Sequence, residues 1–153
     1  MITEATIERV LDRLESGRDD FAQEIADFAE AQPHLMAYVA GEENEIFSEV
    51  ELELLLFGTL VIYQSITDQR FEPPPADPAA IEKAEDGNYA TMNGVKGNFR
   101  TKLDAFFEAT PEEDLLAFAE DLLTTESDEE GAITKEAREP LFVTLKTVVD
   151  VLT

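Results

Sequence analysis

Apolar side chains recur once per helical turn along most of this chain, and this period constrains the fold more than any other feature of the sequence. In the first segment, Ile7, Val10, Leu11 and Leu14 follow the i, i+3, i+4, i+7 spacing of one helix face. No segment shows the sustained period-two alternation of a half-buried strand. The sequence therefore predicts an all-α protein, either a helical bundle or a short array of helical hairpins. The eight expected helical segments are 3–16, 20–32, 34–40, 48–67, 77–92, 95–109, 110–123 and 140–152.

Capping signals place several of the helix starts. Ser48 and Glu51 have the Ser-x-x-Glu spacing of a capping box, in which two side chains bond the free backbone donors of the first turn. Asp77 followed by Pro78 fits an N-cap and a first helical residue. The segment Thr110-Pro111-Glu112-Glu113 combines an N-cap, a proline at N1 and a glutamate at N3. A helix is expected to begin at each of these places.

The stretch from Leu52 to Ile66 is apolar in nearly every direction around a helix. Such a helix must be covered on most sides, so it is expected either at the centre of the fold or in a subunit interface of a homodimer. Polar residues interrupt the stretch, and it falls short of the ~20 residues that cross a bilayer as a helix. We expect it to be a buried core helix.

A proline-rich segment divides the chain. The residues Glu72-Pro73-Pro74-Pro75-Ala76-Asp77-Pro78 cannot be helical until their end, because each proline removes a backbone donor and favours extended geometry in the residue before it. The prediction is one helical domain, 1–153, with halves 1–70 and 77–153 joined by the stiff connector 71–76.

The two halves also share short matches that suggest a duplicated helical unit. Phe28-Ala29-Glu30 matches Phe118-Ala119-Glu120 at an offset of 90 residues. Five further identities occur at an offset of 85 residues, between 51–60 and 136–145. Helical amphipathicity alone also produces such matches, so both explanations stay open.

The charge balance restricts the partners. The chain has 35 Asp and Glu against 11 Lys and Arg, a formal net charge of −24 at pH 7. Phosphate backbones and anionic membranes are repelled by such a surface, so neither nucleic acid nor a membrane is an expected partner. Cationic proteins and metal ions remain. Adaptation to a high-salt cytoplasm would produce the same composition, because salt screens the repulsion between the carboxylates.

The chain contains no cysteine, which excludes disulfides, thiolate-bound zinc and thiol nucleophiles. Its first residues, Met1-Ile2-Thr3-Glu4, have neither a basic region nor an apolar run typical of a secretory signal. A cytoplasmic location is therefore expected.

One acidic loop partly fits a calcium site. The residues from Glu126 to Thr134 place acids at Glu126, Asp128 and Glu130, a glycine at the sixth position and an apolar residue at the eighth, as in an EF-hand loop. The twelfth position, which normally supplies a bidentate glutamate, is Ala137. An exposed acidic turn is the favoured interpretation, with weak calcium binding as the alternative.

The locally basic residues Lys96, Arg100 and Lys102 follow a Gly-x-x-Gly segment and form the candidate anion site. A helix junction whose cations pair with neighbouring acids is the favoured interpretation. His34 is the only histidine, so the chain cannot assemble a multi-histidine metal site, and His34 is expected at the surface.

The function is predicted by elimination. Motifs diagnostic of chemistry are absent while apolar helical surface is plentiful, which favours a noncatalytic protein-interaction module without a cofactor. Three alternatives stay open: an acidic inhibitor or immunity-type protein that masks a basic partner, an enzyme with an unrecognised carboxylate site, and calcium binding at the acidic loop. A buried, paired Asp or Glu in a pocket would favour the enzyme.

Overall fold

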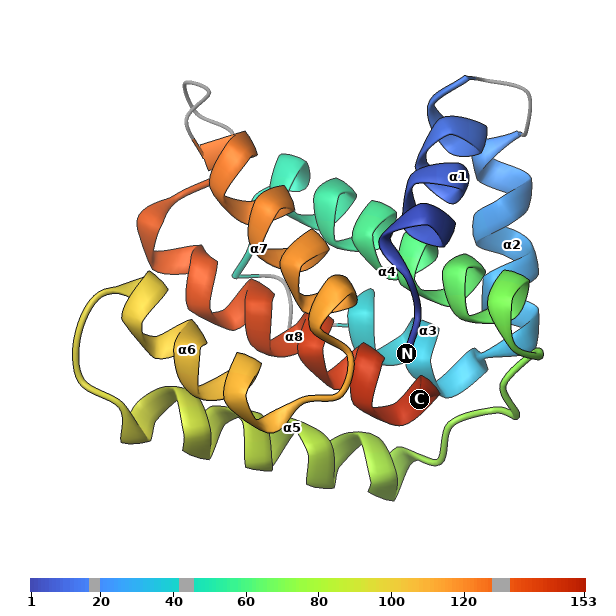
Figure 1. Ribbon diagram of the computed structural model, residues 1–153. Coiled ribbons are helices and arrows are strands. Elements are labelled where there is room, and N and C mark those ends of the chain that lie inside the picture. The colour runs from blue at the N-terminus through green and yellow to red at the C-terminus, as the bar shows by residue number, and fades with distance from the viewer. Residues whose placement is uncertain (17–19, 42–45, 128–132) are drawn as a thin grey trace.

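The computed structural model describes residues 1–16, 20–41, 46–127 and 133–153. Over these residues the chain forms eight α-helices, one 3₁₀ turn and no strand, which confirms the predicted all-α bundle (Figure 1). The elements are α1 (Glu4–Glu15), α2 (Phe21–Ala31), α3 (Pro33–Val39), α4 (Glu49–Gln69), α5 (Pro78–Gly94), α6 (Phe99–Ala109), α7 (Glu113–Ser127), the 3₁₀ turn η2 (Lys135–Ala137) and α8 (Arg138–Leu152).

Two helices, α4 and α8, form the centre of the bundle (Figure 1). They pack against each other; α1, α2 and α7 also pack on α4, while α5 and α7 pack on α8. In the outer layer, α3 packs against α2 and α5, and α6 packs against α5. One set of buried apolar side chains runs through both halves of the chain, from Ile2 to Leu152.

The apolar helix α4 is covered on most sides, as expected. Its buried residues include Leu55, Val61, Ile62 and Ile66, which point in different directions around the helix. Gly58 permits the close approach of two neighbours, since a Cβ there would lie 2.8 Å from Leu122 Cδ2 and 3.1 Å from Leu145 Cδ2. Among the described residues, α4 is the one helix that by length and mean hydropathy could cross a membrane, but 56% of its apolar stretch is buried inside the bundle, as in a core helix.

The last helix differs from the expectation. The sequence pattern predicts an amphipathic helix with one apolar stripe, whereas every residue from Leu141 to Val149 is buried. The polar residues among them find partners within the bundle. Thr144 and Thr147 donate to the carbonyls of Pro140 and Val143, and Lys146 donates to Asp150. The helix is buried all round because α4, α5 and α7 enclose it.

The capping box at the start of α4 is confirmed: Ser48 Oγ accepts from Glu51 N at 3.1 Å, and Glu51 Oε1 accepts from Ser48 N at 2.8 Å. Asp77 caps α5 as predicted, accepting from Ala79 N at 2.8 Å. The expected helix from residue 95 begins only at Phe99, because Gly97 has a φ of 131°, which helices exclude.

The proline-rich connector is extended, and one buried side chain holds it. Gln32, at the junction of α2 and α3, is 0% exposed. Its Nε2 donates to the carbonyls of Pro73 (3.1 Å) and Pro74 (2.9 Å), and its Oε1 accepts from Ala76 N at 2.8 Å. We call these three hydrogen bonds the Gln32 clasp. They satisfy backbone groups that the proline segment cannot pair within itself.

Each half of the chain contributes one of the two central helices. The matches at an offset of 85 residues pair the first part of α4 with η2 and the first part of α8. Phe28 of α2 is buried, whereas its counterpart Phe118 of α7 is only half-buried. The duplication stays a prediction.

Candidate functional site

The residues predicted for calcium lie at the edge of the described chain. Glu126 is in the last turn of α7, but its side chain is not described, and Asp128 and Glu130 lie outside the described residues. Calcium binding at this loop therefore stays a prediction. Elsewhere, the described part of the chain holds no group of three or more metal-ligating side chains.

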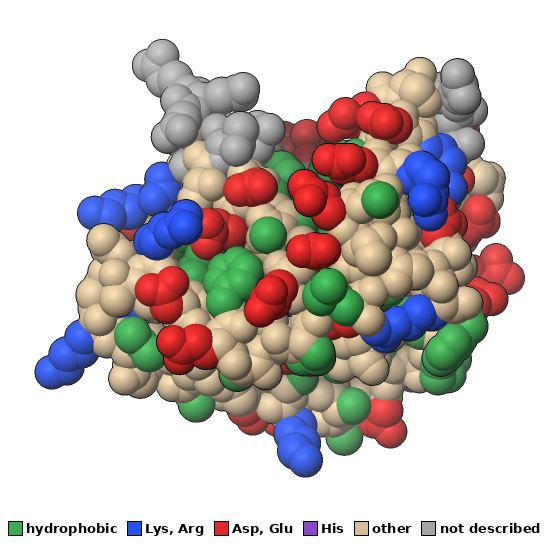
Figure 2. Space-filling model, in the orientation of Figure 1, with side chains coloured by type: hydrophobic (Ala, Val, Ile, Leu, Met, Phe, Trp, Pro, Cys, Tyr) green, Lys and Arg blue, Asp and Glu red, His purple; other side chains and the backbone are tan. Residues whose placement is uncertain are grey.

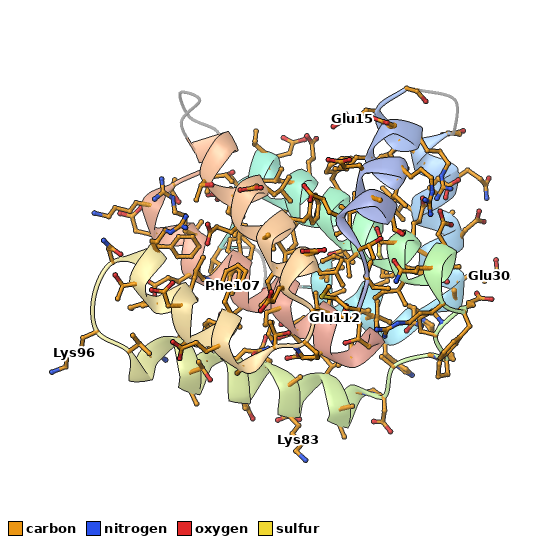
Figure 3. All side chains as sticks on the ribbon, in the orientation of Figure 1. Glu15, Glu30, Lys83, Lys96, Phe107 and Glu112 are labelled. Carbon is orange, nitrogen blue, oxygen red and sulfur yellow. The ribbon has the colours of Figure 1, made fainter. Side chains whose placement is uncertain are left out.

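The three residues of the candidate anion site do not converge. Arg100 Nη1 donates to Glu120 Oε1 at 2.7 Å, and Lys102 Nζ donates to Glu139 Oε1 at 2.9 Å. Lys96 is exposed and points away from the bundle (Figure 3). Two of the three cations thus join α6 to α7 and α8 by ion pairs, and an anion would have to compete with these carboxylates.

His34 is exposed at the start of α3 and borders a shallow hollow between α3 and α5. In this hollow the hydroxyl of Tyr38 donates to Glu85 Oε2 at 2.6 Å. Burial and the neighbouring carboxylate of Glu85 raise the pKa of Tyr38 far above its usual range, so this hydroxyl keeps its proton. The contact ties α3 to α5.

Within the described part of the chain three glutamates, Glu51, Glu112 and Glu120, are buried, and each accepts at least one hydrogen bond from a protein group. Burial by itself would raise the pKa of Glu51. The N–H of Ser48 (2.8 Å) and the N–H and hydroxyl of Thr134 (2.9 and 3.1 Å) donate to its carboxylate and together lower that pKa below its ordinary value of 4.5. Glu51 thereby ties the start of α4 to the segment before α8.

Replacing Glu51 with glutamine is expected to lower the free energy of unfolding by about 1–3 kcal/mol at pH 7, because a charged acceptor of several hydrogen bonds is lost. A lowered folded pKa means that the carboxylate stabilises the fold fully above 4.5 and loses this contribution as the pH falls further. Thermal unfolding between pH 7 and pH 3 should show the difference between wild type and variant shrinking with acidity. The exposed Glu49→Gln is the control, and a difference that does not change with pH would contradict the assignment.

Glu112 is the second buried carboxylate, and it lies directly before the first residue of α7. Its Oε2 accepts from Ile2 N and its Oε1 from Arg70 Nη2, both at 3.0 Å. The helix begins at Glu113 rather than at Pro111, although the hydroxyl of Thr110 does accept from Glu112 N at 3.0 Å. The side chain of Glu112, which is buried, therefore joins the chain start and the end of α4 to α7.

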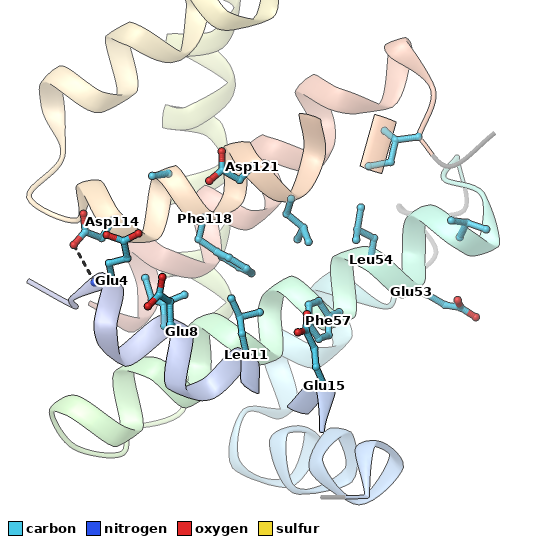
Figure 4. Close-up of a pocket in the computed structure, with 15 residues that line it drawn as sticks. Glu4, Glu8, Leu11, Glu15, Glu53, Leu54, Phe57, Asp114, Phe118 and Asp121 are labelled. Atoms are coloured by element: carbon cyan, nitrogen blue, oxygen red, sulfur yellow. Dashed lines mark hydrogen bonds between the residues drawn. The ribbon is translucent and has the colours of Figure 1, made fainter. Parts of the chain in front are cut away.

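The structure contains a groove of about 710 Å³ between α1, α4 and α7 (Figure 4). Apolar side chains from all three helices form its floor, and several are only half-buried, which leaves apolar surface open to water. The main floor residues are Ile7 and Leu11 of α1, Leu54 and Phe57 of α4, and Phe118 and Leu122 of α7. Ile133, Val50 and Ala117 complete the apolar lining.

Carboxylates surround this floor. Along α1, Glu4, Glu8 and Glu15 line one wall, Asp114 and Asp121 line the α7 wall, and Glu53 of α4 lies at one end. All except the half-buried Asp114 are exposed. None of the described residues that line the groove is Lys or Arg. Figure 2 shows acidic side chains gathered around apolar ones on this face.

The groove is narrow at one end. Glu4 N donates to Asp114 Oδ2 at 3.1 Å, so the first turns of α1 and α7 touch (Figure 4). Thr3 N donates to Gln69 Oε1 at 2.8 Å, which brings the end of α4 to the same place. Helix α4 therefore runs antiparallel to α1 and α7. The groove opens towards the start of α4 and the ends of α1 and α7, where the partial negative charge of these two helix termini adds to the carboxylates.

Sequence reasoning did not identify this groove. Carboxylates two residues apart differ in their surroundings: Glu51 and Glu112 are buried, whereas Glu53 and Asp114 line the groove. A usable signal was present in α1, where Glu4, Glu8, Leu11 and Glu15 recur at helical spacing beside the core stripe. The convergence of three helices, by contrast, depends on tertiary packing.

No known protein family, curated protein or solved structure matches this chain, so its own groove and charges are the basis for a functional proposal.

Proposed function

We propose that this chain is a noncatalytic protein-interaction module that binds a cationic partner protein in the groove between α1, α4 and α7. One observation carries the proposal: six carboxylates surround an apolar floor, and none of the described lining residues is cationic. Unpaired like charges around exposed apolar surface are unfavourable in the free protein. A partner with basic side chains around an apolar patch would neutralise the repulsion between the carboxylates and cover the exposed apolar surface.

The arrangement matches the anatomy of a protein interface, in which an apolar core is surrounded by a polar rim. Phe57 and Phe118 supply aromatic surface to the floor, and aromatic residues are enriched at interface cores. The net charge of −24 would in addition accelerate encounter with a basic partner and repel nucleic acids. The module would thus mask the basic surface it binds.

An enzyme with a carboxylate site is the weaker candidate. General acid or base catalysis calls for a carboxylate in a cleft with a strongly shifted pKa. The buried Glu51, Glu112 and Glu120 accept hydrogen bonds from protein donors and do not line the groove. The rim carboxylates are mostly in water, which suits them to electrostatic recognition.

The test compares two double charge reversals that change the net charge equally. Glu8→Lys with Asp121→Lys alters opposite walls of the groove, whereas Glu30→Lys with Asp104→Lys alters exposed acids on α2 and α6. Each protein, checked for folding by circular dichroism, is immobilised and exposed to lysate of its source cells at low and high salt. We expect basic proteins from the lysate to bind wild type and the Glu30→Lys/Asp104→Lys control and to elute at high salt. The same proteins should not bind the groove variant, Glu8→Lys/Asp121→Lys. Identical captured proteins on both variants would count against the groove.

A further inference from the structure

We infer that the occupant of the groove is a basic amphipathic helix that lies along α4 between α1 and α7, with apolar side chains on the floor and Lys or Arg along both flanks. This inference rests on the proposed function and specifies the chemistry of the partner. It follows from the shape of the groove, from its length and from the placement of its carboxylates.

The shape favours a helix over an extended peptide. Extended peptides are captured mainly by backbone pairing with an exposed strand edge, and the described residues form no strand. The walls and floor here are helices, whose surface side chains form ridges that interdigitate with the ridges of another helix. Leu11, Leu54 and Phe118 come from three different helices and converge on the floor (Figure 4).

The length sets the size of the helix. On the α1 wall the acids run from Glu4 to Glu15, and at 1.5 Å per residue this distance is roughly 17 Å. A helix of about three turns spans it. A small molecule could contact only a few of the six carboxylates at once, whereas a helix of this length can reach carboxylates on both walls and at the open end.

The charges set the pattern of the partner. On α1 the acids recur at spacings of four and seven residues, and on α7 Asp114 and Asp121 are seven apart. Both walls therefore present carboxylates at heptad-like intervals along the flanks of an intervening helix. In paired helices these flanking positions, e and g, carry the charges that select the partner. The complementary segment has Leu-like residues at a and d and cations at e and g.

The same charges disfavour a second copy of this chain as the occupant. The described lining residues are acidic or apolar, and a neighbouring copy would bring a surface of net charge −24 against six carboxylates. A homodimer, expected if the all-round apolar α4 had been left uncovered, is not needed to cover that helix, because α1, α2, α7 and α8 pack on it.

The experiment uses three synthetic peptides of about 14 residues, long enough for the groove but marginally helical alone. The first carries Leu at a and d and Lys at e and g, the second scrambles this composition, and the third has Glu at e and g. Fluorescence anisotropy gives the affinity for wild type, Glu8→Lys/Asp121→Lys and Glu30→Lys/Asp104→Lys, and circular dichroism follows peptide helicity.

We expect the first peptide to gain helicity and to bind wild type about tenfold or more tightly than the scramble, with no binding of the third. The groove variant should weaken this binding about tenfold, and the control less than twofold. Equal binding of the first two peptides, both weakened by the groove variant, would overturn the helical occupant and leave only the proposal that the acidic groove binds a cationic partner. An equal loss of peptide affinity in the groove variant and the control variant would also overturn the assignment of the groove as the binding site.

Two further outcomes would overturn the inference in favour of another occupant. The first is a concentration-dependent dimer in sedimentation that the groove variant abolishes, because a second copy would then fill the groove. The second is displacement of the peptide by an alkyltrimethylammonium compound that binds more tightly than the peptide does. The lysate capture tests the proposed function separately in either case.

Discussion

Replacing Phe142 with alanine is expected to lower the free energy of unfolding by about 3–5 kcal/mol, the largest effect of any substitution considered for this chain. Phe142 is 0% exposed in the central helix α8. Its ring contacts Phe99 and Phe106 edge to face, with centroids 6.0 and 5.2 Å apart. Alanine would leave a cavity between α6 and α8 and remove both aromatic contacts. Urea denaturation at fixed salt measures the loss.

The matched control is Phe71→Ala, because Phe71 is 67% exposed on the connector. That substitution should change stability by roughly 0.5 kcal/mol or less. A loss below about 1 kcal/mol for Phe142→Ala would show that the site is far less tightly packed than its burial indicates.

The second large effect is expected at the Gln32 clasp. Gln32→Ala removes three hydrogen bonds and leaves the buried N–H of Ala76 without its acceptor. The net contribution of each hydrogen bond to stability is about 1 kcal/mol, and a buried donor left without an acceptor costs more. The free energy of unfolding is therefore expected to fall by about 2–4 kcal/mol. Chemical denaturation measures it, and amide hydrogen exchange should report faster opening at Ala76.

Gln23→Ala is the control, since Gln23 is exposed and its side chain donates to Asp27 in its own helix, at 2.9 Å. It should cost roughly 0.5 kcal/mol or less. Equal losses for Gln23→Ala and Gln32→Ala would mean that the clasp adds nothing beyond an ordinary surface amide. Unchanged exchange at Ala76 in Gln32→Ala would contradict the clasp directly.

Two of the local capping signals were predicted correctly from the sequence, whereas α7 begins at Glu113 rather than at Pro111. The capping box of Ser48 and Glu51 and the cap at Asp77 operate within four residues, so spacing alone identifies them. The late start of α6 at Phe99 was not predicted, because nothing in the apolar period shows that Gly97 takes a positive φ.

The burial of α4 was predicted from its all-round apolar surface, but other features that depend on tertiary packing were not predicted. The apolar stripe of α8 is real, but its polar residues Thr144, Lys146 and Thr147 are also buried, because other helices cover them. Each bonds a group of α8 itself, and Thr147 also accepts from Asn88 of α5. Glu112 resembled an ordinary helix-start residue, although it bonds Ile2 N across 110 residues of chain. Sequence spacing gives the face of a helix but not what will lie against that face.

Salt adaptation and partner binding explain different aspects of the acidity. Adaptation to high salt accounts for acids spread over all segments, and it would apply equally to Glu30 and to Glu8. It gives no reason for half-buried Leu54, Phe57 and Phe118 to lie open among carboxylates. The two double charge reversals separate these explanations. Partner binding predicts different effects for the groove acids and for the control acids on α2 and α6, whereas salt adaptation predicts the same effect for both.

The central position of α8 has a consequence for biosynthesis. During synthesis, α1 to α7 emerge from the ribosome before α8, the helix that packs between α4, α5 and α7. Until α8 emerges, the nascent chain cannot bury the surfaces of α4, α5 and α7 that pack on α8, and these apolar surfaces stay in contact with water. Mutual repulsion among its many carboxylates would hold such unfinished chains apart, so the acidity also protects the molecule before it has folded.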